Sequence, residues 1–325
     1  MKDIDWKSLT FGYLRTDYNV RCYYRDGKWG EVEVCSDEYL KLHMAATCLH
    51  YGQEAFEGLK AYRCPDGKVR IFRAEENAAR LQSTARGIVM PEVPTELFVD
   101  MVKKVVRLNQ EYIPPYESGA TLYLRPLLFG ITAGVGVRPA TEYCFLIFAT
   151  PVGPYFKGGF ATNDYVITRQ YDRAAPHGTG HIKAGLNYAM SLHAYVDAHA
   201  HGFDENMYLD AATRTYIEET GGANFLFVTK DGVLVSPKSD SILPSITRRS
   251  LLYIAEHMLG MKTEHRPVKF SELKDFAEAG LCGTAAVISP VGRVVNGDEV
   301  IDFPSGTEKM GPVLQKLYDT ITGIQ

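Results

Sequence analysis

The stretch TPVGPYFKGGF, residues 150–160, divides the sequence into two parts with the same kind of pattern. It is dense in glycine and proline, which favour loops over the interior of helices and strands. Strand-like and helix-like segments alternate before it, and the alternation starts again after it. A chain of 325 residues is long enough for about two domains of ~150 residues each. We therefore predict two α/β domains, at residues 1–152 and 165–325, joined by a loop at 153–164.

The N-terminal part has the pattern of a sheet packed against helices. Asp66 and Gly67 interrupt an alternating apolar run, as in a β-hairpin. Apolar side chains recur at helical spacing further on, so that Leu97, Met101 and Val105 form one stripe. The elements expected here are a hairpin at 58–73, helices at 74–89 and 94–113, and strands at 119–130 and 141–153.

The C-terminal part begins with a strand pattern and ends with helical periodicity. A second hairpin turn is expected at Asp231 and Gly232, and Gly260 is a typical C-terminal helix cap. Side chains at helical spacing predict a helix at 187–202 whose buried face carries Tyr188, Leu192, Tyr195, Val196 and His199. The remaining elements are expected as strands at 164–171, 205–211 and 214–220, a hairpin at 224–237 and a helix at 245–260.

Composition excludes several classes of protein. The net charge is −4 and no segment concentrates basic residues, so we expect no nucleic-acid partner. The longest strongly apolar run, YCFLIFA, is far shorter than the ~18 residues of a membrane span, and the N-terminus has no signal-peptide pattern. Six cysteines are scattered without C-x-x-C pairs, which predicts neither a metal site nor a disulfide framework. These features favour a cytoplasmic protein.

Lys183 has an unusual position, in the segment GTGHIKAGLNY between a glycine-rich run and the first turn of a helix. A cation near a helix N-terminus opposes the helix dipole, which costs about 0.3–1 kcal/mol. One interpretation is that its side chain is solvated, as for most lysines. The other is a desolvated amine that acts as a nucleophile and forms a Schiff base with an aldehyde cofactor.

Two neighbouring glutamates follow in RTYIEETGGAN. Side-chain alternation along a strand places Glu219 on the face of Ile217 and Glu218 on the opposite face. A carboxylate on a buried face requires a cationic partner, and a protonated pyridine nitrogen is one such partner. Either glutamate could instead end the strand in solvent.

Three segments have features of an anion site. Ser245 in LPSITRR is a candidate N-cap, which leaves backbone N–H groups of the first helical turn available to an anion. A Gly-Thr-Ala turn at 283–285 precedes another strand pattern, and Arg80 can hold a phosphate through two nitrogens. Each feature alone also occurs in ordinary capped helices, turns and solvated helix faces.

The order of these segments resembles the branched-chain amino-acid aminotransferases, which are pyridoxal-phosphate enzymes of fold type IV. The resemblance extends from about Cys48 nearly to the C-terminus. It implies an α/β fold with a small N-terminal domain and a larger C-terminal domain with a barrel-like core, assembled as a homodimer. The segments that carry it are HYGQEAFEGLKAYR, LYLRPLLFG, TPVGPYF, DRAAPHGTGHIKAGLNY, YIEETGGANFLFV, LPSITRR and CGTAAVISPV.

The resemblance assigns roles to particular residues. Lys183 would form the Schiff base with pyridoxal 5′-phosphate, Tyr188 would donate to the cofactor phenolate oxygen, and Glu219 would hold the ring nitrogen. The expected phosphate ligands are Arg80, Ile246, Thr247 and Thr284. The expected substrate residues are Tyr51, Phe56, Tyr123, Arg125, Val137, Tyr155, Thr284 and Ala285, with Val137 reaching the pocket of the neighbouring subunit.

The triplet Tyr123-Leu-Arg125 bears on the substrate. It resembles the Tyr-x-Arg of branched-chain enzymes rather than the Arg-x-His of D-amino-acid aminotransferases, and it implies that Arg125 binds the γ-carboxylate of glutamate. The expected reaction is transfer of the amino group of leucine, isoleucine or valine to 2-oxoglutarate. Two alternative functions stay open: a D-amino-acid aminotransferase or an aminodeoxychorismate lyase of the same fold, and a cofactor-binding protein without turnover. Arg125 could also only pair with a nearby carboxylate.

Overall fold

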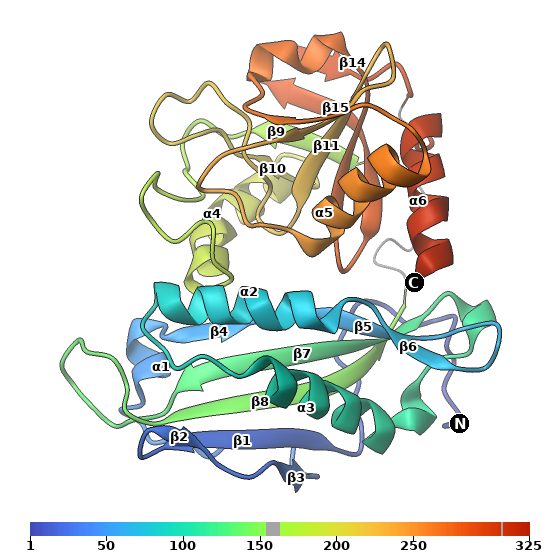
Figure 1. The fold of residues 1–325 in the computed structure, drawn as a ribbon. Helices are drawn as coiled ribbons and strands as arrows, with labels where there is room; N and C mark the ends of the chain where they lie inside the picture. The colour runs from blue at the N-terminus through green and yellow to red at the C-terminus, as the bar shows by residue number, and fades with distance from the viewer. Residues whose placement is uncertain (154–162, 307) are drawn as a thin grey trace. The chain divides into compact units, whose positions relative to one another are not determined.

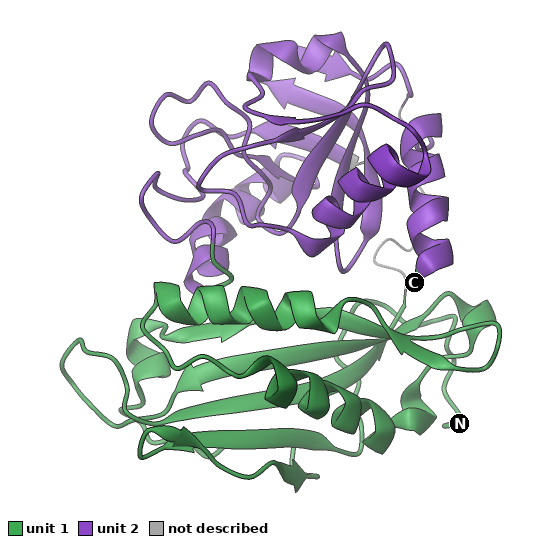
Figure 2. Ribbon diagram, viewed as in Figure 1, with its two compact units in different colours: residues 1–155, 182–185, 325 green, residues 156–181, 186–324 purple. Residues whose placement is uncertain are grey.

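The computed structural model describes residues 1–153, 163–306 and 308–325 (Figure 1). The chain divides into two compact units (Figure 2). Unit 1 comprises Met1–Tyr155, Ile182–Gly185 and Gln325, and unit 2 comprises Phe156–His181 and Leu186–Ile324. The segment Ile182–Gly185 therefore belongs with unit 1, although it lies far along the sequence inside unit 2. The boundaries at 152 and 165 stay a prediction.

Unit 1 is built on an antiparallel sheet with the strand order β2-β1-β8-β7-β5-β6, in which β3 pairs with β1 and β4 with β7. Its strands are β1 (Asn19–Arg25), β2 (Lys28–Trp29), β3 (Glu33–Cys35), β4 (Glu54–Phe56), β5 (Leu59–Arg63), β6 (Val69–Ile71), β7 (Thr121–Gly130) and β8 (Tyr143–Val152). Its helices are α1 (Thr47–Tyr51), α2 (Ala74–Gly87) and α3 (Thr95–Leu108), with short 3₁₀ turns at Gln110–Tyr112 and Tyr116–Ser118.

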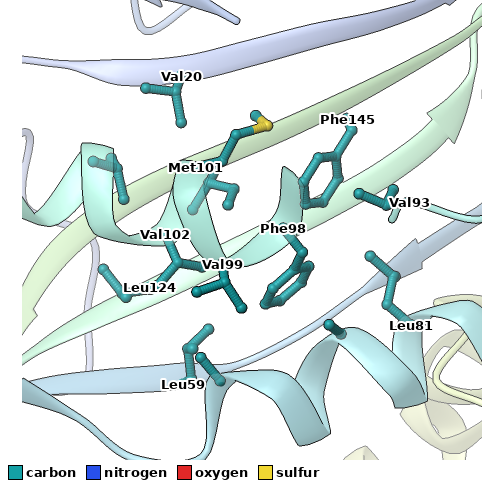
Figure 3. Packing of buried hydrophobic residues seen from close by; sticks show 14 of the residues in the cluster. Val20, Leu59, Leu81, Val93, Phe98, Val99, Met101, Val102, Leu124 and Phe145 are labelled. Atoms are coloured by element: carbon teal, nitrogen blue, oxygen red, sulfur yellow. The ribbon is translucent and has the colours of Figure 1, made fainter. Parts of the chain in front are cut away.

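Helices α2 and α3 cover one face of this sheet. Phe98 and Met101 of α3 and Leu81 of α2 pack against Leu124 and Phe145 of the strands (Figure 3). Side chains alternate between the two faces of a strand, so the residues of β7 next to Leu124 point to the opposite face. That second face therefore carries polar side chains of β5 and β7 that the core does not use.

Unit 2 contains a mixed sheet with the order β10-β9-β15-β14-β11-β12-β13, and β16 pairs with β15. Its strands are β9 (Asn163–Ile167), β10 (Glu205–Met207), β11 (Asn224–Thr229), β12 (Leu234–Pro237), β13 (Thr263–Arg266), β14 (Phe276–Gly283), β15 (Val287–Asn296) and β16 (Glu299–Asp302). Its helices are α4 (Leu186–Ala200), α5 (Ile246–Tyr253), continued by a π-helical turn at Ile254–Met258, and α6 (Pro312–Ile324), with a 3₁₀ turn at Phe270–Asp275.

The sheet of unit 2 buries apolar side chains on both faces. Leu226 and Ile288 face the cluster that includes Leu314 of α6, whereas Phe225 and Phe227 belong to a separate cluster on the other face. Strands buried on both sides have nearly continuous apolar runs, which explains the sequence NFLFV of β11.

Most expected elements are confirmed, and two expectations are wrong. Residues 214–220 do not form a regular strand, because this segment makes only isolated bridges, such as Leu209 with Ile217. Helix α4 is present, but most of the face predicted to be buried is exposed, with only Tyr188 half-buried. Its small side chains Ser191, Ala194 and Ala198 face inward instead. The larger apolar side chains of α4 are therefore exposed in the single chain.

Among the described residues, no helix is sufficiently long and apolar to span a membrane.

Candidate active site

The segment that carries Lys183 is attached to unit 1 by backbone contacts. The Lys183 N–H donates to Thr84 Oγ1 of α2 at 2.9 Å, and the Phe56 N–H donates to the Lys183 carbonyl at 3.2 Å. Ala184 also forms an antiparallel bridge with Ala55 of β4. The segment thus lies against β4 like a short additional strand, which restrains the main chain on both sides of the lysine.

Gly185 completes this attachment. Its N–H donates to the Glu54 carboxylate. Burial raises the pKa of Glu54, and this hydrogen bond from Gly185 opposes part of that increase. A Cβ atom at Gly185 would overlap with Glu54 Oε1. Only glycine fits at this position while Glu54 keeps its place.

We expect Gly185→Ala to lower the free energy of unfolding by about 1–3 kcal/mol, because the added methyl group displaces Glu54. Urea denaturation of the purified protein measures this change. The same substitution in a Glu54→Ala background should cost less, because the clash is absent. Gly323→Ala is the matched control, since a Cβ there meets no atom within 4 Å. Equal losses in both backgrounds would contradict the proposed clash.

Two cations flank the ring of Phe56 on the face of the sheet that is opposite to α2 and α3. Lys183 Nζ and the Arg125 guanidinium carbon each lie 4.7 Å from the ring centroid. Arg125 also lies 5.3 Å from the ring centroid of Tyr123 and donates to the Tyr123 hydroxyl at 3.1 Å. These distances are typical of cation–π contacts. The sequence-predicted residues Lys183, Phe56, Tyr123 and Arg125 are thus gathered in unit 1.

The charge of Arg125 is not matched by a carboxylate within ion-pair distance among the described residues. Its Nε is buried and makes no hydrogen bond there. Glu54 feels the charge of Arg125 only as a minor effect on its pKa. The interpretation of Arg125 as the partner of a structural carboxylate therefore has no support in the described residues.

Arg80 lies elsewhere in unit 1, on the buried side of α2. Its Nε and one terminal nitrogen each lie 2.8 Å from an oxygen of Glu57, whose carboxylate also accepts from the Asn77 side chain. Arg80 and Glu57 are almost completely buried. Thr84, which holds the Lys183 N–H, also donates to the Arg80 carbonyl. Arg80 is therefore fixed one helical turn from the residue that anchors the lysine segment.

The remaining expected substrate residues of unit 1 are Tyr51, Val137 and Tyr155. The Tyr51 hydroxyl donates to the Val135 carbonyl, in the same loop as Val137. Val137 itself is 85% exposed. Tyr155 falls outside the described residues.

Glu219 lies in unit 2 with both carboxylate oxygens engaged. Oε1 accepts from the Leu243 N–H at 2.8 Å and forms an ion pair with an Arg173 terminal nitrogen 2.8 Å away, and Oε2 accepts from the Asn224 side chain at 2.5 Å. Burial raises the pKa of Glu219 to about 7, and the charge of Arg173 opposes that increase. Such a carboxylate is stabilised by any further positive charge nearby.

Glu218 is also buried, although the alternation argument placed it on the other face. Ser239 donates to its Oε1 at 2.7 Å, and burial raises its pKa. In contrast to Glu219, it makes no ion pair within 4 Å among the described residues. The two glutamates are therefore distinguished by their partners and not by burial.

The start of α5, one of the anion-site candidates, is connected to Glu219 in unit 2. Ser245 caps α5 as predicted by accepting from the Arg248 N–H at 3.1 Å, so that Ile246 and Thr247 occupy the first turn. Leu243, which donates to Glu219, lies two residues before the cap. The first turn of α5 is thus tied to the Glu219 carboxylate through the short loop before it.

Thr284 and Ala285 form the turn between β14 and β15. The strand β14 pairs Cys282 with Asn224, the residue that donates to Glu219. Val287 ends the turn with φ +63°, a conformation that is rare for a β-branched residue. Such strained residues concentrate at functional sites.

Tyr188 is half-buried in the first turn of α4, five residues after Lys183. Sequence reasoning missed Arg173, Glu57 and Glu54, because their partners are distant in the sequence. It also missed Asn224, although its partner Glu219 is only five positions away. Arg173 lies in a segment already singled out, and a buried arginine there would have required a carboxylate. Among the described residues, no group of histidines, cysteines and carboxylates could hold a metal ion.

Residues 54–294 match the family model described as Amino-transferase class IV. The chain belongs to the class IV aminotransferases. This aminotransferase is 52% identical to a branched-chain-amino-acid aminotransferase of Haemophilus influenzae, over all of this chain and 96% of that protein.

Solved structures of class IV aminotransferases have the same fold. A branched-chain amino acid aminotransferase of Escherichia coli is 30% identical, with a TM-score of 0.79 and coverage of 95% of both chains. A branched-chain amino acid aminotransferase of Thermobaculum terrenum, solved in its PLP-form, is 25% identical, with a TM-score of 0.79 and coverage of 95% of this chain and 94% of that chain. The predicted family and fold class are confirmed.

Proposed function

We propose that this aminotransferase moves the amino group of L-leucine, L-isoleucine or L-valine to 2-oxoglutarate, with pyridoxal 5′-phosphate as its cofactor. The observation that carries the proposal is the environment of Arg125, which is held against two aromatic rings. A pocket that binds both leucine and glutamate must accept an apolar side chain and a carboxylate in turn. An arginine held against aromatic rings meets both requirements.

The described residues fit the cofactor. Lys183 supplies an amine beside an aromatic ring. Glu219 supplies a carboxylate whose pKa is raised by burial, so a cationic partner would stabilise its ionised form. The capped start of α5 supplies backbone N–H groups for a phosphate. Arg80 is preoriented by Glu57, and a guanidinium held in this way can bind a second anion beside the first. We assign the phosphate to Arg80, Ile246, Thr247 and Thr284.

The residues of this chain then have distinct tasks. Bound pyridoxal phosphate supplies the electron sink for the bond-breaking step. Lys183 Nζ would hold the cofactor and, once the incoming amino acid frees it, would take the proton from the substrate Cα and return it at the adjacent carbon, so that no net proton is left on the lysine. Glu219 keeps a proton on the ring nitrogen, and Tyr188 donates to the phenolate oxygen. The Thr284 and Ala285 N–H groups bind the substrate α-carboxylate. The second substrate uses the same groups in reverse order.

Arg125 explains how one pocket serves two kinds of substrate. Burying a glutamate γ-carboxylate without a partner would cost several kcal/mol, so a cation must be available when glutamate binds. When leucine binds, the rings of Phe56 and Tyr123 still stabilise the guanidinium. The cation is therefore tolerated in both half-reactions. We assign the pocket walls to Tyr51, Phe56, Tyr123 and Tyr155, with Val137 contributed to a second subunit.

Arg125→Leu tests the proposed function. We expect kcat/KM for 2-oxoglutarate and glutamate to fall by about 2–5 kcal/mol in free-energy terms, because the γ-carboxylate loses its partner. The half-reaction with L-leucine should change far less. Single-turnover measurements of each half-reaction separate the two effects, and D-leucine serves as the control substrate that should not react. Equal losses in both halves would assign Arg125 to the scaffold or to the α-carboxylate.

We also propose that the protein is a cytoplasmic homodimer. Leu192, Tyr195 and Val196 on α4 are exposed in the single chain, as are Val135 and Val137. Exposed apolar groups of this size favour burial against another subunit.

A further inference from the structure

Arg173 has an environment that the proposed function does not yet use. It lies in the loop before α4, and its side chain is 5% exposed. One terminal nitrogen donates to the carbonyls of Gly180 and Ser241 and lies 2.8 Å from Glu219 Oε1, with which it forms an ion pair. These two carbonyls come from different loops, Gly180 from the loop before α4 and Ser241 from the loop between β12 and α5, and together they hold the guanidinium in place. Arg173 is thus a fixed charge against one oxygen of Glu219.

The contacts of Glu219 differ between its two oxygens. An ionised carboxylate offers about four acceptor positions, two on each oxygen. Arg173 and the Leu243 N–H occupy Oε1, whereas the Asn224 side chain is the contact that Oε2 makes among the described residues. One acceptor position on Oε2 therefore remains for a further donor.

A second buried guanidinium lies within electrostatic range of Glu219. Arg248 of α5 lowers the pKa of Glu219 and has a buried Nε without a hydrogen-bond partner among the described residues. The other titratable groups that face Glu219 are Glu218, beside it in the chain, and Cys282 of β14. The two arginines are the positive charges that offset the burial of Glu219.

We propose that Arg173 is a positioning residue that keeps Glu219 ionised and turns its Oε2 toward the cofactor ring nitrogen, with Arg248 adding a weaker effect of the same sign. This inference rests on the proposed role of Glu219. A proton shared by a carboxylate and a pyridine moves to the carboxylate when that carboxylate is buried without a cation. A fixed guanidinium on the other oxygen reverses that preference, so the proton stays on the ring nitrogen, where it is needed.

The protonation state of the ring nitrogen tests the inference directly. The holoenzyme is prepared with cofactor labelled with ¹⁵N in the ring, and its ¹⁵N NMR signal is recorded at one fixed pH near 7.5. We expect a pyridinium signal for the wild type and a signal shifted to that of neutral pyridine for Arg173→Met. Arg173→Lys should restore the pyridinium signal, because it restores the charge. A purely structural role would not follow the charge in this way.

The outcomes are distinguishable. A wild-type enzyme that does not hold the labelled cofactor, or holds it with a neutral ring, would contradict the proposed role of Glu219 itself. A folded Arg173→Met variant that keeps the pyridinium signal overturns the inference about Arg173 alone. If Arg173→Met does not fold, Arg248→Met removes the second cation without breaking an ion pair within 4 Å among the described residues. A partial shift toward neutral pyridine then supports the inference, and an unchanged signal overturns it.

Discussion

Lys183→Ala is expected to lose covalent attachment of the cofactor and to lower amino transfer by about 10²- to 10⁴-fold or more, because the same amine attaches the cofactor and moves the Cα proton. The wild-type enzyme should be yellow, and reduction with borohydride should fix the cofactor to the peptide that contains Lys183. Peptide mapping by mass spectrometry locates the label, and single-turnover kinetics measures the loss.

Lys60 is the informative comparison for this experiment. It is a second buried lysine of unit 1, and burial lowers its pKa to about 8. A lysine with this pKa is partly neutral near pH 8, and a neutral amine is nucleophilic. The label should nevertheless be absent from the Lys60 peptide in both proteins. A borohydride-stable label at Lys60 in the Lys183→Ala variant would overturn the assignment of Lys183.

Glu219→Gln is expected to lower transamination by about 10²- to 10⁴-fold, in the range of the ~3–5 kcal/mol associated with breaking a buried charge pair. The amide cannot keep the ring nitrogen protonated, and it leaves Arg173 without its carboxylate. Steady-state kinetics with L-leucine and 2-oxoglutarate measures the change. Circular dichroism of the variant checks that unit 2 is still folded.

Glu218→Gln is the matched control for that substitution. It removes the neighbouring buried carboxylate, whose Oε1 accepts from the Ser239 hydroxyl. A glutamine can still accept that hydrogen bond, so we expect kcat/KM to stay within about threefold of the wild type. If the two variants lost activity equally, the assignment of the ring nitrogen to Glu219 would be wrong.

Local signals in the sequence predicted most elements of both sheets. Asp66-Gly67 and Asp231-Gly232 were sufficient for the two hairpins, because glycine adopts the positive φ that these turns require. Ser245 caps α5 as predicted, since capping depends on residues only three positions apart. Helix α4 was predicted correctly in extent but not in orientation, because periodicity identifies an apolar face without indicating what covers it.

Charged side chains were harder to place than apolar ones. The resemblance indicated Arg80 and Glu219 as site residues, but neither Glu57 nor Arg173 was recognised as a partner. Each pair joins residues separated by more than 20 positions. Local spacing does not encode such a pair, because the partner is set by which strands and loops meet in the folded chain.

The sequence by itself determined the family and the hairpin turns and led to the proposed role of Lys183, because motif order and turn residues act over short distances. Only the tertiary structure decided that the lysine segment attaches to β4 of unit 1, and that Glu54 requires a glycine at position 185. It also decided which buried cation accompanies Glu219. The physical reason is the same in each case: a buried charge or backbone group must find a partner, and long-range folding alone selects that partner.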